Sequence, residues 1–597
     1  MIDGLQRCQF PALFVLLMSV SVCVALEAQQ KYDPSSLASP TISGPISVYD
    51  NWSTYDELSD HVPLTQELTM RELDQVLRLR RAGVRFDYYV IDAFWFDPDG
   101  AYRTWKKPNW PDGPDLWLKT CLDNGIRPGL WFSTNTLVHI NAAPQWRSSL
   151  NKQGGAMSMF EGGFLPDFME TLQSWYGRGV RMFLFDFADL TAATPAAEAT
   201  LSKEEIVRRN SAALREALIR FRRKNRDVVL EAFNGFGGVM DSTYYPFPFK
   251  DPVDLRWLEA FDSLYCGDPR PGDVPEMNFW RSLEIYSDHQ TRRYEESGVP
   301  VERIDTTSFM PGVTGTIYRR GFQEWKGSLL LTLARGGWIN TSYGNLELLS
   351  DEGARWFARV QSLFLHLQAI GRTHPFGGIP GEDQPYGFGS LDAEGSVYVV
   401  VNPRQEMASI HLPLLAAEQM PLARGRVQFR DAGFVPRLSG DTLELGPGQM
   451  AMVGYGRYAG EIFDFGVQDD TVIPRSIESL PADFQAVSRG VIRAVLPAPA
   501  EGDLRLIFQQ YDPDGTLHRT MDANTAMGRI FQMKAEQGGH EIPIHKEYDH
   551  VIWSGLSWAA GEIRQKDLQA GSPVTVTFES TEKAPVTLRG ELYRVRY

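Results

Sequence analysis

The chain has 597 residues, a length that suggests two to four domains. Its 43% hydrophobic and 22% charged residues are typical of a globular protein. The formal net charge of −16 argues against nucleic acids and anionic membrane surfaces as partners, because both bind basic protein surfaces.

The amino terminus has the pattern of a secretory signal peptide. Arg7 supplies a positive charge, residues 10–26 are almost wholly apolar, and Cys23-Val24-Ala25 forms a small-residue cleavage pattern. We predict that residues 1–28 are a cleaved signal and that the protein is secreted or periplasmic. A lipoprotein anchored through Cys23 is the alternative. No later segment is long and apolar enough to span a membrane.

Residues 29–44 are rich in Ser, Pro and Gln and are interpreted as a linker. From 45 to 370, apolar runs alternate with amphipathic stretches, which is the signature of βα units and a parallel sheet. Eight strands are predicted, the number that a closed (β/α)8 TIM barrel requires. They are Ile46–Asp50, Phe86–Ile91, Arg127–Phe132, Arg181–Asp186, Val228–Ala232, Ser263–Gly267, Arg303–Thr307 and Gly336–Asn340. Helices are predicted at Leu68–Ala82, Lys203–Asn225 and Pro275–Glu296.

Beyond residue 370 the pattern changes to short alternating runs separated by turns, such as Ser396–Val401 and Leu504–Phe508. We predict two C-terminal β-rich domains, 371–457 and 458–597, with antiparallel β-sandwiches as their form. Only Cys121 and Cys266 remain after signal cleavage, and we do not expect a disulfide between them. No spacing of Cys or His matches a metal site, so neither a metal nor an organic cofactor is predicted.

Acidic residues recur at the carboxyl ends of the predicted strands. Asp92 ends the second strand, Asp186 the fourth and Glu231 the fifth, and Asp268 follows the sixth. A charge at such a position does not serve the core, because burying it without a partner is costly. In a (β/α)8 barrel these ends form the active-site face. The pattern indicates a retaining glycosidase in which one carboxylate is the nucleophile and another the general acid/base.

Further residues near the same ends are candidates for sugar binding. Trp52, Trp95 and Trp131 could form a sugar platform, with packing in the core as the alternative. Arg270 could bind substrate, with a surface salt bridge as the alternative. The glycines of segment 235–238 are expected to let the backbone approach a ligand closely. The candidate substrate-binding residues are Trp52, Asp92, Trp95, Trp131, Glu231, Asn234 and Arg270.

In order and spacing, these motifs resemble the α-galactosidase clan, glycoside hydrolase families 27 and 36 (clan D, melibiase-like), over about residues 45–370. The segment 89–95 is similar to the clan's Asp-Asp-Gly-Trp strand, 127–131 to its Gly-Leu-Trp strand, 184–186 to its Lys-x-Asp, and 265–268 to its Trp-x-Ser-Asp. The resemblance implies that Asp186 is the nucleophile and Asp268 the acid/base. Leu184 stands where the clan has the Lys that contacts sugar hydroxyls, so galactose itself is not implied.

Two other acids are alternatives for the acid/base. Asp262 lies at the start of the sixth strand, nearer the wrong end of the barrel. Asp288 lies in the helix predicted over Pro275–Glu296, where we expect a solvated or capping charge outside the barrel mouth. We prefer Asp268, because it follows the strand directly.

The sequence therefore predicts a secreted, retaining exo-α-glycosidase of the α-galactosidase type, acting on oligo- or polysaccharides by a double displacement. A non-catalytic carbohydrate-binding protein on a decayed barrel is one rival, motivated by Leu184 and by the additional domain 458–597. A transglycosylase is the other. The sequence does not indicate the sugar, the linkage or the oligomeric state.

Overall fold

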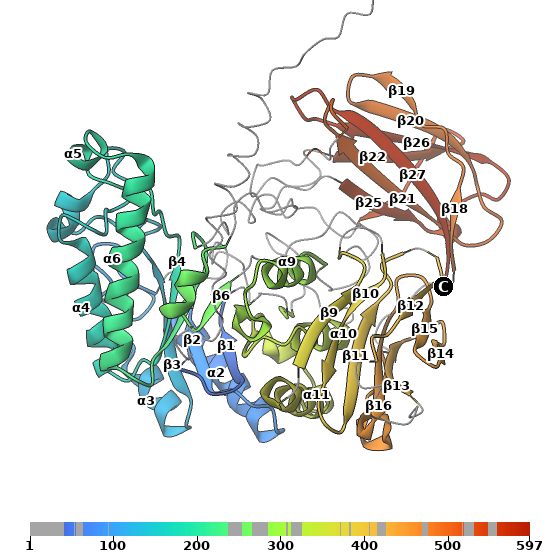
Figure 1. Ribbon diagram of the computed structural model, residues 1–597. Coiled ribbons are helices and arrows are strands. Elements are labelled where there is room, and N and C mark those ends of the chain that lie inside the picture. The colour runs from blue at the N-terminus through green and yellow to red at the C-terminus, as the bar shows by residue number, and fades with distance from the viewer. Residues whose placement is uncertain are drawn as a thin grey trace, which may run out of the picture. The chain divides into compact units, whose positions relative to one another are not determined.

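The computed structural model (Figure 1) describes most of the chain after residue 40. The described residues are 41–52, 54, 64–93, 95–236, 253–265, 285–305, 309–311, 325–370, 372–380, 384–404, 406–414, 425–468, 476–515, 518, 531–546 and 558–597. The predicted signal, Cys266, Asp268 and Arg270 lie outside them. No helix of the described part has the length and apolar character needed to cross a membrane.

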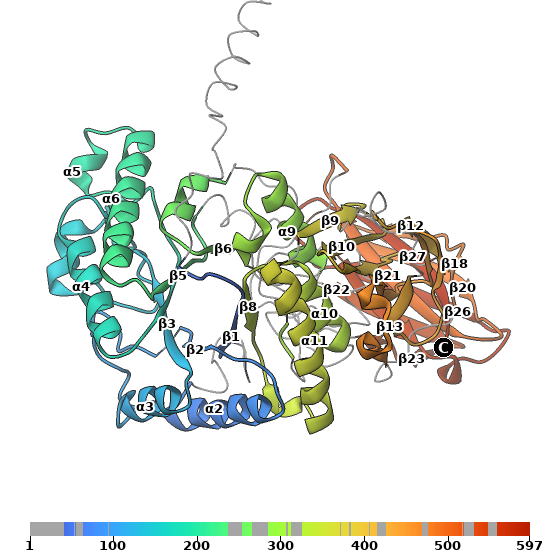
Figure 2. The same ribbon diagram turned by 60° about the horizontal axis from the view of Figure 1, so that its bottom comes forward.

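Eight parallel strands form one sheet, and they confirm the predicted (β/α)8 barrel. They are β1 (Ile46–Asp50), β2 (Tyr88–Ile91), β3 (Arg127–Ser133), β4 (Met182–Asp186), β5 (Val229–Ala232), β6 (Ser263–Tyr265), β7 (Ile304–Asp305) and β8 (Ile339–Ser342). Neighbours pair in the order β7-β6-β5-β4-β3-β2-β1-β8. An isolated parallel bridge between Phe309 and Ser342 joins the two ends of this order. In Figure 2 the strands encircle a common centre.

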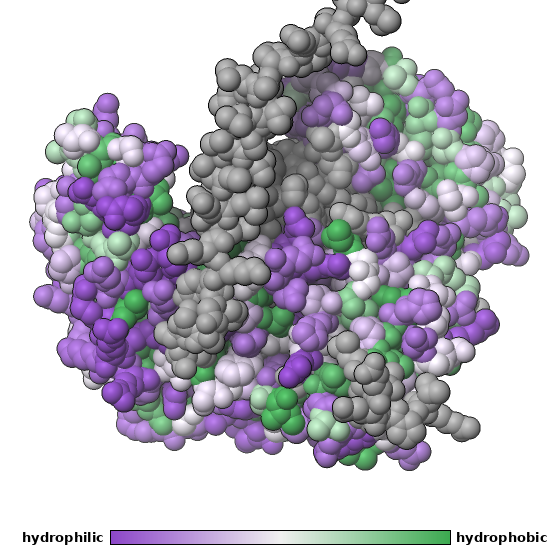
Figure 3. All heavy atoms as spheres, viewed as in Figure 1, coloured by the Kyte–Doolittle hydropathy of each residue, from purple (hydrophilic) through white to green (hydrophobic). Residues whose placement is uncertain are grey.

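Helices cover the outside of the strands, as Figure 2 shows for α2, α3, α4 and α6. The helices of the barrel region are α2 (Gln66–Arg81), α3 (Asp115–Asp123), α4 (Phe164–Gly177), α5 (Pro195–Glu198), α6 (Lys203–Lys224), α9 (Ile285–Glu296), α10 (Trp325–Ala334) and α11 (Asp351–Ile370). Ser202 caps α6 by accepting the N–H of Glu205, and the last turn of α6 is basic, which suits the negative end of a helix dipole. Hydrophilic residues predominate over the outer face of α6 (Figure 3).

Strand β4 shows how the barrel orients its side chains. Phe183 packs on Phe221 of α6 and Phe185 packs on Phe168 of α4, with ring centroids 5.7 and 6.2 Å apart. Successive strand residues point to opposite faces of a sheet. Leu184 and Asp186 therefore face the inside of the barrel, away from the helices.

Antiparallel sheets follow the barrel in the chain, as predicted. One sheet has the order β17-β13-β16-β11-β10-β9 and packs on a second, β12-β15-β14, through a shared apolar core. Two five-stranded sheets then form a sandwich, in which the rings of Phe508 and Phe578 stack 3.8 Å apart. The strands are β9 (Arg372–Gly377), β10 (Tyr386–Leu391), β11 (Gly395–Val401), β12 (Ala408–His411), β13 (Arg426–Asp431), β14 (Arg437–Ser439), β15 (Thr442–Leu445), β16 (Met450–Gly456), β17 (Gly466–Gln468), β18 (Ser476–Leu480), β19 (Gln485–Ser488), β20 (Val491–Pro497), β21 (Asp503–Tyr511), β22 (Phe531–Gln537), β23 (His540–Ile542), β24 (His545–Lys546), β25 (Trp558–Ile563), β26 (Pro573–Ser580) and β27 (Thr587–Arg596).

The structure corrects the predicted environment of Asp288. This residue lies in a helix, α9, but it is fully buried and not a solvated or capping charge. Its Oδ1 accepts from Nε of Arg335 at 2.7 Å, and its Oδ2 accepts from the hydroxyl of Tyr386 on β10 at 2.6 Å. A buried carboxylate needs such partners. The hydrogen bond from Tyr386 to Asp288 joins helix α9 of the barrel to the sheet that follows it, across 98 residues of sequence.

Candidate active site

Asp186 is the last residue of β4, and three N–H donors hold its carboxylate. The backbone N–H groups of Phe187 and Asn234 donate to Oδ1 at 2.7 and 3.1 Å. The indole N–H of Trp131 donates to Oδ2 at 3.2 Å. Donors of this kind stabilise the negative charge and fix the orientation of the side chain. The arrangement suits a carboxylate that must attack one point in space.

The backbone next to Asp186 has an unusual conformation. Phe187 has a φ of 48°, in the left-handed region that aromatic residues rarely adopt. Its half-buried ring meets the ring of Trp131 edge to face, with centroids 6.1 Å apart. Strain of this sort collects at functional sites, where the surrounding structure holds it in place.

The chain after β4 runs beside the chain after β5. The N–H of Ala188 donates to the carbonyl of Asn234 at 3.0 Å. Gly235 has a φ of 101°, and a Cβ there would lie 2.1 Å from the carbonyl oxygen of Ala188. The close approach that Gly235 permits in the structure is to the backbone of Ala188, and the prediction of a close approach to a ligand is not tested by it. Gly237 and Gly238 lie outside the described residues.

Asp50 and Asp92, at the carboxyl ends of β1 and β2, form a carboxyl pair. Both are buried. Burial raises the pKa of each, and the proximity of the two groups raises the pKa of Asp92 further. Both carboxyls therefore hold a proton more tightly than ordinary carboxyls do. Asn51 positions Asp92, because its Oδ1 accepts the backbone N–H of Asp92 at 2.9 Å.

Glu231 lies one layer deeper in the barrel than Asp186. It is 1% exposed, pairs in register with Leu184 of β4, and accepts the hydroxyl of Ser263 at 2.9 Å. Burial and the neighbouring carboxyl of Asp305 on β7 raise its pKa well above the usual value. The hydroxyl of Ser263 and the carboxyl of Asp305 surround Glu231 within the barrel, so we assign it a role in supporting the site and not in contacting substrate.

The three predicted platform tryptophans have different environments. Trp95 is fully buried and packs among Tyr102, Trp105 and Trp175, with ring centroids 4.6 to 6.2 Å away, so it is a core residue and the predicted platform role is corrected. Trp131 is 2% exposed and serves Asp186 through its indole N–H. Trp52 is half-buried, next to Asp50, and of the three it has the most exposed ring.

The structure gives Asp262 a structural role. It is fully buried, forms an ion pair with Arg222 at 3.1 Å, and accepts the backbone N–H of Leu230 at 2.9 Å. These contacts lie at the amino-terminal end of β6, opposite the carboxyl ends of the strands where Asp186 lies. Asn234 is placed beside Asp186, where its backbone N–H is the contacting group.

Sequence reasoning missed Asp50, Asp305 and Glu72. Asp50 carries the same signal as the residues that were found, an acid at the end of a predicted strand. Asp305 was in the middle of the predicted strand Arg303–Thr307, and it ends β7 only in the structure. Glu72 had no such signal, because it lies on α2 and reaches the barrel wall, where Tyr89 donates its hydroxyl to Oε2 at 2.6 Å. Within the described ranges, no three His, Cys, Asp or Glu side chains are placed to bind a metal.

The raised pKa of the buried Glu72 carboxyl can be tested through the pH dependence of stability. Burial raises its pKa from 4.5 to about 8. Between these values the folded chain keeps a proton that the unfolded chain has lost, so stability from this group falls as the pH rises toward 8. Glu72→Gln, which cannot titrate, should lose less stability between pH 5 and pH 8 than wild type, by up to a few kcal/mol, roughly 1.4 per pKa unit at most.

Urea unfolding at pH 5 and pH 8 measures the difference. Glu352→Gln, an exposed change on α11, is the control and should show the wild-type pH dependence. An equal loss of stability in Glu72→Gln and wild type would contradict the buried, protonated state of Glu72.

The fold and the site define a class: a (β/α)8-barrel protein with carboxyl groups gathered at the strand ends. No protein-family model matches the chain. No curated protein matches it either. Solved structures that it resembles include the family 36 α-galactosidase AgaA of Geobacillus stearothermophilus, with 13% identity and a TM-score of 0.47, covering 69% of this chain and 55% of that chain.

Two more structures resemble the chain. The α-galactosidase of Lactobacillus brevis has 11% identity and a TM-score of 0.48, over 69% of this chain and 55% of that one. A family 27 β-L-arabinopyranosidase of Geobacillus stearothermophilus has 15% identity and a TM-score of 0.46, over 70% and 98%. The chain thus spans about half the length of these two α-galactosidases. A function for this chain must rest on its own residues.

Proposed function

We propose that this protein is a secreted, retaining exo-α-glycosidase of the α-galactosidase type, acting on terminal α-linked sugars of oligo- or polysaccharides. The observation that supports it most is the carboxylate of Asp186, held by three N–H donors at the end of β4. The backbone N–H groups of Phe187 and Asn234 and the indole N–H of Trp131 fix the orientation of this carboxylate, as a nucleophile requires.

The proposed mechanism has two displacements. Asp186 attacks the anomeric carbon and forms a glycosyl-enzyme while Asp268 protonates the departing oxygen. Asp268 then takes a proton from water, which hydrolyses the intermediate. In the sequence Asp268 follows Tyr265, the last residue of β6, by three positions, and the proposal requires it to lie at the same end of the barrel as Asp186.

The carboxyl pair of Asp50 and Asp92 would bind sugar hydroxyls. A protonated carboxyl donates a hydrogen bond through its hydroxyl and accepts one through its carbonyl oxygen. Such a pair can therefore contact two neighbouring hydroxyls of one sugar ring. The charge of Asp186 lies near this pair and contributes to the raised pKa of Asp92.

The stereochemical outcome tests the mechanism. Proton NMR of the first product formed from an aryl α-glycoside should show the α anomer, because two displacements at one carbon restore the configuration. This requires carboxyls about 5–5.5 Å apart, whereas inversion requires about 6.5–9.5 Å. A β anomer as the first product would refute the proposal. Sugar binding without turnover across a panel of aryl α-glycosides would favour the non-catalytic rival, and transfer to added sugars would favour the transglycosylase.

Leu184 predicts an altered sugar preference. It faces the barrel interior, is 2% exposed, and pairs in register with Trp131 and Glu231. A Lys there would offer a charged donor to sugar hydroxyls, and Leu offers none. A site that lacks a polar contact cannot strongly reject a sugar that lacks the matching hydroxyl. We expect one monodeoxy aryl α-galactoside to be cleaved with kcat/KM within about tenfold of the parent sugar.

The parent aryl α-galactoside should itself be a mediocre substrate. Leu184→Lys, placed next to the carboxyl of Glu231, should increase discrimination against that deoxy sugar. A wild-type kcat/KM for the parent in the range of about 10⁴–10⁸ M⁻¹s⁻¹, with strong rejection of every deoxy sugar, would show that another residue supplies the missing contact.

A further inference from the structure

A cavity of about 640 Å³ lies at the amino-terminal ends of the barrel strands. We call it the basal pocket. Because the strands are parallel, their first residues share one end of the barrel, and Asp186, the last residue of β4, belongs to the other. The lining residues are the first residues of four strands, Ile46, Tyr88, Arg127 and Val229, together with 41–45, Arg85, Arg226, Asp227, Leu365, His366 and Ala369.

Arginines outnumber carboxylates along the lining of the basal pocket. Asp227, its one lining carboxylate, is paired with Arg181 at 2.8 Å, and Arg85 is paired with Asp87 at 2.8 Å. The hydrogen bond with Tyr88 and, with it, the charges of Asp227 and Asp87 raise the pKa of Arg127. Asp262, which accepts the backbone N–H of Thr41 in the pocket lining, is paired with Arg222. His366 lies 3.6 Å from Asp392.

Two other arginines, Arg127 and Arg226, line the basal pocket. Within the part of the chain that the structure describes, no carboxylate lies within ion-pair distance of Arg127 or Arg226. Both are exposed side chains that line the pocket. Two arginines without a direct ion pair at one pocket are notable in a chain whose net charge is −16, because repulsion between like charges is relieved by an anion.

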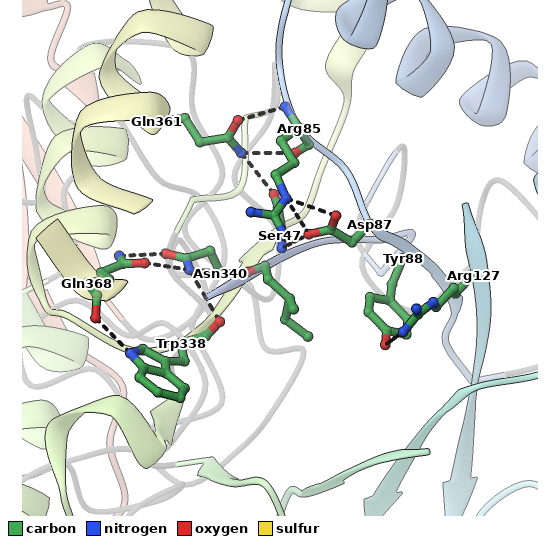
Figure 4. A network of polar contacts seen from close by, with 10 residues as sticks. Ser47, Arg85, Asp87, Tyr88, Arg127, Trp338, Asn340, Gln361 and Gln368 are labelled. Carbon is green, nitrogen blue, oxygen red and sulfur yellow. Dashed lines mark hydrogen bonds and ion pairs between the residues drawn. The ribbon is translucent and has the colours of Figure 1, made fainter. Parts of the chain in front are cut away.

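Tyr88 adds a hydroxyl to this charge. The guanidinium of Arg127 donates to the hydroxyl oxygen of Tyr88 at 3.0 Å and lies 5.7 Å from the ring centroid (Figure 4). The tyrosine is 1% exposed, so its ring is fixed by the barrel wall. Among the described residues, its hydroxyl hydrogen has no acceptor. The hydroxyl is therefore held in place by Arg127 and is left able to donate.

We propose that the basal pocket binds a tetrahedral oxyanion, a phosphate or sulfate group, through the guanidinium groups of Arg127 and Arg226 and the hydroxyl of Tyr88. The planar fork of an arginine matches two oxygens of such a group, and hydrogen bonds to it are strengthened by charge. The volume exceeds that of a lone ion, so a group carried on a sugar fits as well as a free one.

Binding here has a consequence for the barrel. The three contacts come from the first residues of β2 and β3 and from the turn before β5, so a bound anion joins segments that the sequence separates widely. A ligand that binds only the folded state stabilises it in proportion to the logarithm of its concentration. Turnover should be unaffected, because the pocket and Asp186 lie at opposite ends of the barrel. The inference does not depend on the proposed function.

The test uses the full chain and three probes: inorganic phosphate, inorganic sulfate and a hexose phosphate. Isothermal titration calorimetry gives the dissociation constant, and thermal unfolding gives the shift in Tm against sodium chloride of equal ionic strength. Arg226→Gln removes a side chain with no described partner, so the fold is retained. Arg223→Gln is the matched control, because it removes the same charge three residues away from an exposed position outside the pocket.

We expect saturable binding to wild type and Arg223→Gln, at least tenfold weaker binding to Arg226→Gln, and a similar loss in Arg127→Gln. Tighter binding of the hexose phosphate than of both inorganic ions would identify a sugar-borne group, and equal binding would identify the free ion. Absence of saturable binding to wild type would overturn the proposal. So would an equal rise in Tm for wild type and Arg226→Gln, because phosphate and sulfate stabilise many proteins without a site.

Discussion

Asp186→Asn should abolish turnover, with a fall in kcat of at least about 10⁴-fold on aryl α-glycosides. The change is nearly isosteric, and the amide cannot attack the anomeric carbon. Its effect on the fold should be small, since the backbone N–H groups of Phe187 and Asn234 can still donate to the amide oxygen. Steady-state kinetics and a thermal unfolding curve of the same preparation measure both effects.

The matched control is Asp227→Asn. This residue lies at the other end of the barrel, just before β5, in an exposed ion pair with Arg181. Exposed pairs contribute little to stability, so the variant should keep both its Tm and its activity. If Asp186→Asn retains activity within about tenfold of wild type at an unchanged Tm, Asp186 is not the nucleophile and the proposed mechanism fails.

The ends of β1 and β4 were predictable from the sequence because each is a largely apolar run that ends at an aspartate. The prediction of β4 ends at Asp186, as the structure does, and β1 is reproduced residue for residue. Asp50 was in that predicted strand and was still not recognised as part of the site. Its importance depends on Asp92, its partner on the neighbouring strand, and strand pairing is what the fold supplies.

Other features depend on contacts between residues far apart in the chain, which local patterns do not reveal. Trp95 follows the end of β2 and Trp131 lies near the end of β3, yet the ring of Trp95 turns into the core, where it packs against Trp105 and Trp175. Asp288 has the sequence context of a helix surface. Its burial follows from Tyr386, on a strand that the sequence could not place against α9.

The second prediction distinguishes Asp268 from Asp288 as the general acid/base. Asp268→Ala should slow substrates with basic leaving groups far more than activated aryl glycosides, because a general acid matters most when the departing oxygen is hard to expel. Azide should partly restore the second step, since it attacks the glycosyl-enzyme without a general base. The pattern of leaving-group dependence and azide rescue is specific to the acid/base and does not arise from loss of stability.

Asp288→Ala should produce the opposite result. It removes the carboxylate that pairs with the buried guanidinium of Arg335, and breaking a buried pair in this way costs about 3–5 kcal/mol. Tm should fall strongly, while the fraction that remains folded should keep the wild-type dependence on the leaving group and gain nothing from azide. Asp288→Asn, which keeps the hydrogen bonds of Tyr386 and Arg335 within reach, should recover part of the lost stability. If Asp288→Ala instead shows azide rescue at an unchanged Tm, the catalytic acid lies on α9, and the assignment of Asp268 at the end of β6 must be abandoned.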